Sequence, residues 1–375
     1  METHISELLD KFPKYKDAAN DKWENVPITT RNDIENWTID KCPEKPVLIA
    51  MTSGSTGKPV IVYFNKSAVL SKIDSLKNYY KGFVQENDLF YHFMGPPNLI
   101  RASIEGMFFD LNKLCVAFDV PNKDNANKII SAISLAQPSW IIGTISGINA
   151  LLELGIPIKA RAMVVGGSLI NKKFQESVCS YFGCKYYFNA YASNEFGVIA
   201  SNVENSDELV VKSNLLLEVL DDNGKINEEG TGKLLVTDYT NFSMPFIRYV
   251  LGDRVILHKE NGKTYIEVLG RNDNLFNFDE QMVSSNILIV ELNNLLGHDK
   301  FYITINHHEI SLYDYAEVHI LLEDVNKEPI IKEKLTPILR KPPVVIGTEK
   351  MIQSANGKYI NFIDLRKTKS SGVHW

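Results

Sequence analysis

Short apolar runs alternate with segments of helical spacing over the first 200 or so residues of the chain. The runs 45–52, 139–145, 160–167 and 184–193 end at turn residues and predict strands, the first of them buried. Residues 125–137 and 171–183 carry apolar residues at helical spacing, and Gly183 stands where the second helix should end. Strands that alternate with helices predict a parallel α/β sheet.

The pattern changes after about residue 200, where strand-like runs flank an Asn-Gly turn within 214–240 and predict a hairpin region. A further mixed segment begins near residues 270–274. A chain of 375 residues is long for one domain. We therefore expect an α/β protein whose large N-terminal domain, residues 1–270, has parallel and mixed sheets with helices. A small mobile α+β C-terminal domain, residues 271–375, should follow.

Composition narrows the class of protein. Hydrophobic residues make up 44% of the chain and charged residues 23%, which is ordinary for a globular protein, and the net charge is −6. The chain has no basic stripe with interleaved aromatic residues, so nucleic acid is not an expected partner. Neither a signal peptide nor a membrane span is evident, so a cytoplasmic location is expected. The four cysteines are too few for a disulfide scaffold and lack the spacing of a zinc site.

The stretch "TSGSTGKP" at 52–59 follows the first expected strand. Glycines allow backbone N–H groups to close around an anion, and hydroxyls and a lysine add donors and charge. Only two residues separate Gly54 from Gly57, and Pro59 follows Lys58, so this is not the ATPase phosphate loop. A phosphate-binding loop and a flexible surface turn both fit the stretch taken alone.

Four further stretches follow in order: "YASNEFG" at 191–197, "RYVLGDRV" at 248–255, "GRNDN" at 270–274 and "NGKYINFIDLR" at 356–366. Together with the Gly-rich loop they resemble the motifs of the adenylate-forming superfamily, which includes acyl- and aryl-CoA ligases, peptide-synthetase adenylation domains and luciferases. The form of residues 232–255 is most similar to the phenylacetate-CoA ligase and capsule-biosynthesis branch. The resemblance covers about residues 50–366.

The resemblance implies an acid:thiol ligase. ATP and Mg²⁺ would convert an aromatic or small carboxylic acid into an acyl-AMP, and a thioester would then form on CoA or on the phosphopantetheine of a carrier protein. An acyl-protein synthetase is an alternative, although all four cysteines precede residue 185. A non-catalytic nucleotide-binding scaffold derived from the family is another.

The same resemblance implies roles for individual residues. Glu195 would bind Mg²⁺, Asn194 would donate to the α-phosphate, Asp253 would accept the ribose hydroxyls, and Lys358 would stabilise the pentavalent transition state. Arg271 would add a ribose or phosphate contact, Asp273 would mark the hinge, and His92 would screen the carboxylate. Contacts to nucleotide and acid would come from Thr52, Ser53, Gly54, Ser55, Thr56, Gly57, Lys58, Gly166, Gly167, Ser168, Ala190, Tyr191, Ala192 and Ser193. Each of these has a plain structural alternative, such as a turn cap, a core histidine or a surface charge.

Several positions depart from the family pattern. Ala192 replaces a glycine and narrows the wall where the acid usually lies, and Asn194 replaces a threonine. Asn277 and Glu280 stand where members carry a lysine and a glycine near the pantetheine tunnel. The negative charge of Glu280 favours a docked carrier arm over free CoA. A cationic run in the small domain could meet CoA phosphates, an acidic carrier protein or only solvent: Lys327, Lys332, Lys334, Arg340 and Lys341.

Overall fold

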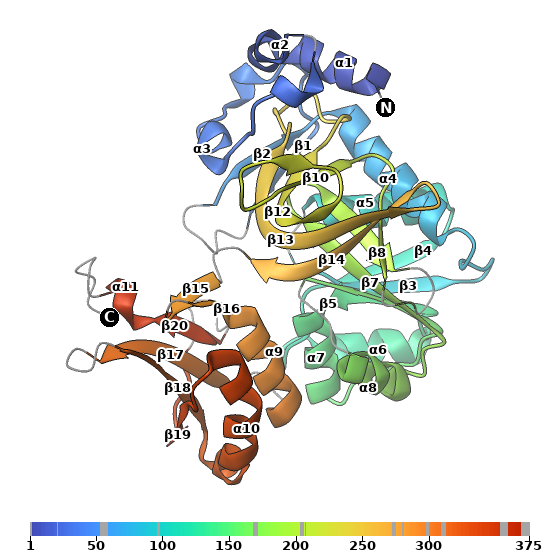
Figure 1. Cartoon of the computed structure of the whole chain (residues 1–375). Coiled ribbons are helices and arrows are strands. Elements are labelled where there is room, and N and C mark those ends of the chain that lie inside the picture. The colour runs from blue at the N-terminus through green and yellow to red at the C-terminus, as the bar shows by residue number, and fades with distance from the viewer. Residues whose placement is uncertain are drawn as a thin grey trace. The chain divides into compact units, whose positions relative to one another are not determined.

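The computed structural model describes residues 2–20, 22–52, 59–95, 98–167, 172–202, 206, 208–271, 275–279, 281–297, 300–308, 313–352 and 359–368 (Figure 1). The chain divides into two compact units, Met1–Leu269 and Gly270–Trp375. The first carries a large mixed sheet and the second a small one, so the predicted α/β class with a large and a small part is confirmed.

The first unit is built on a twelve-stranded sheet of order β11-β10-β12-β13-β14-β9-β8-β7-β6-β5-β3-β4. One end of this sheet is parallel, because β4, β3, β5, β6 and β7 pair parallel to one another in that order. Its strands are β3 (Leu89–Phe93), β4 (Leu114–Phe118), β5 (Trp140–Thr144), β6 (Ala162–Gly166) and β7 (Tyr186–Ser193). The strands expected at 139–145, 160–167 and 184–193 are therefore confirmed.

Helices cover both faces of the parallel part (Figure 1). Alternate strand residues such as Tyr91, Ile141 and Val165 pack against one set of helices, α6 (Ala126–Leu135), α7 (Ile145–Glu153) and α8 (Lys172–Phe182). The intervening residues pack against α4 (Lys66–Tyr80) and α5 (Leu99–Asp110). The helices expected at 125–137 and 171–183 are thus confirmed, and Gly183 ends the second with φ +74°.

The other half of the sheet is antiparallel from β7 onward. The predicted hairpin region is confirmed, with β11 as an additional two-residue strand beside β10. The strands of this antiparallel half are β8 (Gly197–Asn202), β9 (Leu209–Val211), β10 (Leu216–Leu220), β11 (Ile226–Asn227), β12 (Gly230–Thr237), β13 (Tyr249–Glu260) and β14 (Lys263–Arg271).

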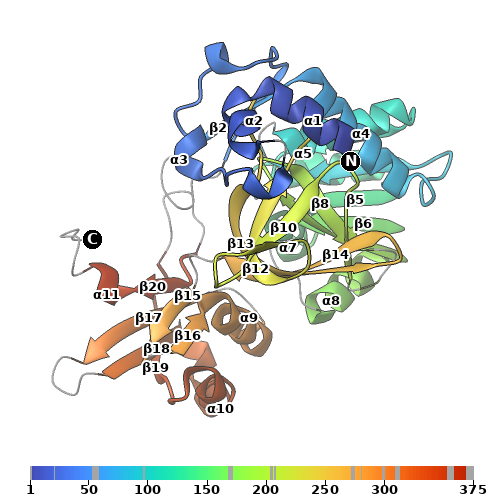
Figure 2. The same cartoon turned by 45° about the horizontal axis from the view of Figure 1, so that its top comes forward.

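A buried ion pair fastens the N-terminal segment to this half. Arg248 and Glu218 are 3% and 4% exposed, and two guanidinium nitrogens donate to the carboxylate at 3.0 and 2.9 Å. The same guanidinium donates to the carbonyl of Val26 at 2.9 Å, and Trp23 Nε1 donates to Glu218 at 3.0 Å. The helices of this segment gather at one end of the antiparallel half (Figure 2): α1 (Glu2–Lys11), α2 (Pro13–Ala19) and α3 (Arg31–Ile34).

The strand expected at 45–52 exists as β1 (Leu48–Met51), and it pairs antiparallel with β2 (Ile61–Phe64) in a separate two-stranded sheet. Its predicted burial is wrong. Ile49 and Met51 are 53% and 59% exposed, because one face of a two-stranded hairpin is left uncovered. An apolar run of this length does not distinguish a central strand from a hairpin arm.

The second unit has its own hydrophobic core, which lies between a four-stranded sheet and two helices. The sheet order is β19-β18-β17-β20, and a β15–β16 hairpin precedes it. The elements are β15 (Leu275–Phe278), β16 (Gln281–Ser284), α9 (Ser285–Leu296), β17 (Phe301–His308), β18 (Tyr313–Leu321), α10 (Glu328–Leu339), β19 (Val344–Thr348), β20 (Phe362–Asp364) and α11 (Leu365–Thr368).

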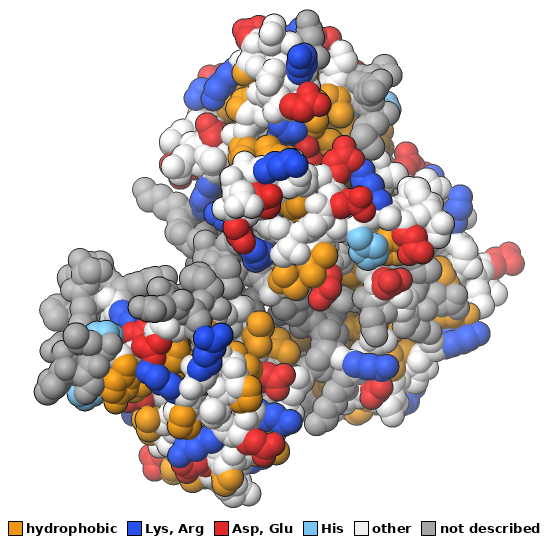
Figure 3. Space-filling view, viewed as in Figure 1, with side chains coloured by type: hydrophobic (Ala, Val, Ile, Leu, Met, Phe, Trp, Pro, Cys, Tyr) orange, Lys and Arg blue, Asp and Glu red, His pale blue; other side chains and the backbone are white. Residues whose placement is uncertain are grey.

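Basic and acidic side chains are mixed over the surface coloured in Figure 3. Within the described ranges, no helix combines the length and the apolar character that a membrane crossing requires.

Lys212, which follows β9, is a buried lysine that is only 5% exposed. Its Nζ lies 3.1 Å from the centroid of the Tyr79 ring, and within the described part of the chain it has no hydrogen-bond acceptor. Burial disfavours the charged ammonium and lowers the pKa of Lys212 to about 7. An unfolded lysine titrates near pKa 10.4. At pH values between these two pKa values, the unfolded chain binds more protons than the folded chain. Lys212 therefore makes the free energy of unfolding rise with pH.

We predict that Lys212→Met is more stable than the wild type at pH 7 and that the difference shrinks as the pH rises toward 10. The substitution should raise the free energy of unfolding at pH 7 by on the order of 2–4 kcal/mol, because each unit of pKa difference corresponds to about 1.4 kcal/mol. Urea unfolding at several pH values measures it, with the exposed Lys66→Met as the matched control. A stability difference that does not change with pH would contradict a neutral buried amine.

Candidate functional site

The site begins at the carboxyl ends of the parallel strands, where open α/β sheets bind ligands. Gly166 ends β6, and a Cβ built on it would lie 2.7 Å from the carbonyl oxygen of Ala190 on β7. Gly167 follows with φ +94°, a conformation that side chains disfavour. Thr144 ends β5 and caps α7 by accepting from the Gly147 N–H at 3.2 Å. The two glycines therefore keep this edge open beside the β7 backbone.

The segment 191–197 forms the end of β7, a tight turn and the first residue of β8. Phe196 is fully buried among Phe246 and Tyr249, which anchors the turn in the core of the antiparallel half. Gly197 has φ +69°, so the glycine of this motif is required by the turn. Glu195, half-buried, directly precedes these two fixed residues.

Asn194 joins this turn to the base of the Gly-rich loop. Its Nδ2 donates to the carbonyl of Met51 at 2.8 Å. The base itself is closed by two bonds: Thr52 N–H donates to the Val60 carbonyl at 3.0 Å, and Val60 N–H donates to Thr52 Oγ1 at 2.9 Å. The turn that carries Glu195 and the base of the loop are therefore held side by side. Residues 53–58, the rest of the predicted loop, lie outside the described residues.

Asp253 is brought to Tyr191 by an irregularity in β13. The β12–β13 pairing skips from Lys233↔Arg254 to Leu235↔Val250, and Gly252 has φ +93°. Such a bulge re-aims the side chain beside it. Asp253 is 8% exposed and accepts from Tyr191 Oη at 2.5 Å. The fold thus brings the end of β7 and the Gly-Asp motif together.

An apolar cavity of about 80 Å³ leads away from these strand ends, between the sheet and helices α4 and α5. Gly166, Gly167, Ala190 and Ala192 line it at the sheet. Its remaining walls are Leu76, Tyr80, Met94, Ile100, Ile104, Met107, Phe108, Trp140, Ile142, Gly143, Thr144, Val164 and Val198. All of the lining residues are uncharged, so the cavity suits an apolar group.

His92 points to the same face of the sheet as Phe90 and Met94, but it is not among the cavity's lining residues. It is fully buried, and its Nε2 lies 2.9 Å from Glu105 Oε1 on α5. Arg101 Nε donates to the same oxygen at 2.9 Å. Burial lowers the pKa of His92, which favours the neutral imidazole. The contact links β3 to α5.

Other predicted residues are placed as follows. Ser193 accepts from the Phe196 N–H at 3.2 Å, so its hydroxyl stabilises the turn. Arg271 ends β14 and belongs to the second unit. Ser168, Asp273, Glu280 and Lys358 lie outside the described residues.

Sequence reasoning missed most of the cavity wall, including Tyr80, Met107 and Trp140. For the strand residues among them, such as Trp140, the alternation within 139–144 could have indicated the wall, because it sends every second side chain to one face.

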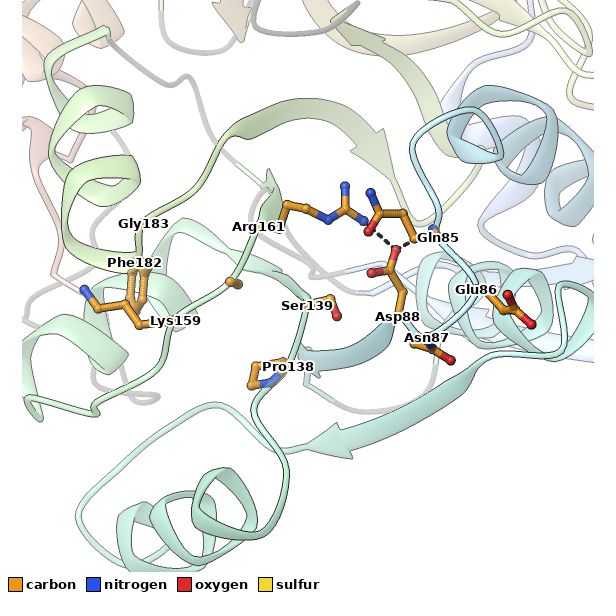
Figure 4. Close-up of a pocket in the computed structure, with 11 residues that line it drawn as sticks. Gln85, Glu86, Asn87, Asp88, Pro138, Ser139, Lys159, Arg161, Phe182 and Gly183 are labelled. Atoms are coloured by element: carbon orange, nitrogen blue, oxygen red, sulfur yellow. Dashed lines mark hydrogen bonds and ion pairs between the residues drawn. The ribbon is translucent and has the colours of Figure 1, made fainter.

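A larger open depression of about 760 Å³ lies at the opposite edge of the sheet, at the amino ends of β3, β5 and β6 (Figure 4). Arg161 points at Asp88 across it, with Nη2 2.6 Å from Oδ2, and also donates to the carbonyl of Phe83 at 3.1 Å. Trp140 Nε1 donates to the same Asp88 oxygen at 2.9 Å. These groups satisfy one another within the fold, so the depression is a structural feature of the strand starts.

A family model described as AMP-binding enzyme matches residues 4–244. The chain belongs to this family, and the predicted membership of the adenylate-forming superfamily is confirmed. The indoleacetate–lysine synthetase of Pseudomonas savastanoi is 25% identical over 292 residues, which cover 73% of this chain and 70% of the synthetase. Protein CapK of Staphylococcus aureus is 24% identical over 290 residues, which cover 70% of this chain and 62% of CapK. Neither of these two relatives is named as a phenylacetate–CoA ligase.

Solved structures share the fold. One is a 2-hydroxyisobutyryl-CoA ligase in the postadenylation state, in complex with an acyl-AMP, with a TM-score of 0.74 at 15% identity. The match covers 97% of this chain and 88% of the ligase chain. ATP-bound MatB from Rhodopseudomonas palustris has a TM-score of 0.64 at 16% identity, covering 89% and 69%. At these identities the likeness concerns the fold alone.

Proposed function

We propose that the protein activates a carboxylic acid with ATP. A carboxylate oxygen attacks the α-phosphorus, the bond to the β-phosphate oxygen breaks, and acyl-AMP and pyrophosphate are formed. The observation that carries the proposal is the 2.8 Å bond from Asn194 to the Met51 carbonyl, because it holds the base of the Gly-rich loop beside the turn that bears Glu195. A phosphate loop and a carboxylate for a cation are the two parts that charge neutralisation on ATP requires.

The strand ends fit a nucleotide. Gly166 lets the end of β6 lie against the β7 backbone, where a Cβ would come within 2.7 Å of the Ala190 carbonyl oxygen, and glycines at such close approaches are typical of nucleotide sites. Asp253 offers a buried carboxylate, which suits the vicinal hydroxyls of a ribose. In the free protein one of its oxygens accepts from Tyr191, and the ring of Tyr191 would lie beside the bound nucleoside.

Glu195 would hold Mg²⁺, a cation that is usually bound by one or two carboxylates together with substrate phosphates. Bound there, the ion would neutralise charge on the phosphates. Lys358 would supply the remaining positive charge at the α-phosphate, and rotation about Asp273 would withdraw it before the second half-reaction. His92 would position α5, which forms one wall of the cavity, through Glu105.

The cavity would hold the acyl group, with the carboxylate left at the glycine edge. Its uncharged lining disfavours a second carboxylate or an ammonium group on the substrate. A space of about 80 Å³ accepts a short or branched hydrocarbon, whereas a benzene ring occupies a cavity of about 150 Å³ in other proteins. Met94 and Met107 line the space, and flexible methionines could shift to admit a ring. The substrate would therefore be a compact apolar acid, with or without one ring.

We predict acid-dependent and Mg²⁺-dependent exchange of labelled pyrophosphate into ATP. Asp253→Asn keeps the side-chain shape but loses the charge-assisted ribose contact, and should weaken ATP binding about tenfold. Lys358→Ala should slow the exchange roughly 10²–10³-fold, the scale for removing one positioned charge stabiliser.

The exposed residues Asp222→Asn and Lys350→Ala serve as matched controls and should leave the exchange unchanged. No exchange with any acid of a broad aryl and short-acyl panel would favour the non-catalytic scaffold. An unaltered affinity of Asp253→Asn for ATP would remove Asp253 from the site.

Two variants with opposite effects test the acyl cavity. Ala192→Leu should fill it and raise KM for ring-bearing acids by about 10–200-fold relative to the smallest accepted acid, the usual range for a steric contact in an apolar pocket. Met107→Ala should enlarge it and shift the preference toward larger acids. Thermal unfolding shows that each variant is folded. The same acid preference in both variants would place the acyl group elsewhere.

The acceptor of the acyl group is a separate question. A thioester on CoA or on carrier phosphopantetheine is the first candidate. An amide on an amine is a second, because one relative is named as a synthetase that joins indoleacetate to lysine. The cationic run offers less to CoA than its charge suggested: Lys327 pairs with Asp324 at 2.8 Å, Lys332 with Glu328 at 2.6 Å, and Lys341 with Asp279.

We expect product to accumulate with one acceptor class when enzyme, ATP and acid are mixed separately with CoA, a phosphopantetheinylated carrier protein or free lysine. Mass spectrometry distinguishes a thioester from an amide, and hydroxylamine cleaves only the former. Because three of the four lysines of the run are engaged internally, we expect the carrier thioester to form faster than the CoA thioester. Faster transfer to free CoA, or an amide alone, would overturn this expectation.

A further inference from the structure

The twelve-stranded sheet ends on β4, a strand that has a partner on only one side within the described part of the chain. Natural proteins commonly protect such an edge with charge, proline, a bulge or a very short strand. The opposite end of the same sheet follows this rule, because β11 has two residues. β4 does not: it has five residues, Leu-Cys-Val-Ala-Phe, and pairs regularly with β3 along its whole length.

Three strongly exposed apolar side chains lie on β4 itself and on the helices that precede and follow it in the chain, α5 and α6. Leu114, the first residue of β4, is 76% exposed. Phe109, near the end of α5, is 88% exposed, and Leu135, the last residue of α6, is 89% exposed. No other large apolar residue of the described chain is as exposed as these three. Phe109 and Leu135 lie on helices that pack on opposite faces of the sheet, α5 and α6.

The residues that flank β4 indicate what covers it. If two copies of β4 pair antiparallel about Val116, Leu114 lies opposite the second copy's Phe118 and Cys115 lies opposite Ala117. In the same register Lys113 of each copy lies opposite Asp119 of the other, at both ends of the paired strands. Asp119 is exposed, and Lys113 lies at the surface with Nζ donating to the Glu86 carbonyl at 2.6 Å. Opposite charges directly across an antiparallel pair are stabilising.

We propose that β4 is the interface of a homodimer, in which two copies of the chain pair their β4 strands antiparallel about Val116. The two sheets then continue into one another across a twofold axis, and each unpaired edge is removed. A stable interface typically buries about 1,600 Å² in total, and five paired residues on each copy supply only a small part of that area. Phe109, Leu114 and Leu135 supply additional apolar surface twice, once from each copy. Isologous contacts of this kind are the commonest route to a closed oligomer.

Sedimentation velocity over a range of micromolar concentrations tests the proposal on the full chain. The wild type should form a species of twice the 42.4 kDa monomer mass. Leu114→Arg should raise the dimer dissociation constant roughly a hundredfold. Leu322→Arg is the matched control, since Leu322 is also exposed, at 56%, and lies in the second unit. Both substitutions replace exposed side chains, and thermal unfolding confirms that each variant is folded.

A charge exchange tests the register. Lys113→Glu or Asp119→Lys alone should each weaken the dimer roughly tenfold, because like charges then face each other at both ends. The double variant should recover most of the wild-type affinity. A wild type that remains monomeric at every concentration overturns the proposal. A dimer unaffected by Leu114→Arg also overturns it, and so does a dimer that both single variants weaken but the double variant does not restore.

Discussion

Burial of the parallel strands from both faces is the constraint on which the site depends. Strands β3, β5, β6 and β7 send alternate residues into two separate cores, so no strand end can shift without disturbing both. Each fully buried apolar side chain contributes about 1.5–3 kcal/mol, and each polar contact at the site only about 1 kcal/mol net. Apolar burial therefore decides where the strand ends lie, and hydrogen bonds such as that from Asn194 only orient the groups on them. The apolar cavity is the part of one core that side chains leave unfilled, and it extends to the glycines at the end of β6.

The sequence predicted β5, β6 and β7 well, because these strands are apolar on both faces and two neighbouring helices, α6 and α8, have clear periodicity. It did not predict β3 and β4. The same reasoning failed for β1, whose apolar run is as strong as that of β5 although it forms one arm of a hairpin with an uncovered face. The cavity could not be predicted either. Its walls combine residues from several strands with α4 and α5, and only tertiary packing shows which of two apolar faces retains a void.

The motifs identified which segments meet, but not what each side chain does in the free protein. Asn194 was expected to face a phosphate, and here its amide binds the backbone at the base of the loop. Ser193 caps a turn, and Tyr191 donates to Asp253. Ligand-free sites satisfy their buried polar groups with one another, because an unpaired group costs about 1–3 kcal/mol. A motif shows which residue types a ligand needs. It does not show these contacts, because they depend on the bulge at Gly252 and the turn at Gly197.

The N-terminal segment bears on the site through the start of β13. Thr29 bridges to this strand: its N–H donates to the Arg248 carbonyl at 3.2 Å, and the Val250 N–H donates to the Thr29 carbonyl at 3.0 Å. Arg248 itself has φ +47° and is held by Glu218 in a pair whose disruption typically costs 3–5 kcal/mol, because it leaves a buried charge. The strand that carries Asp253 is therefore fixed at its first residues by the N-terminal segment and, five residues after Arg248, by the contact with Tyr191. Between these two points lies the bulge, so its glycine can set the direction of Asp253 while both ends of the segment stay in place.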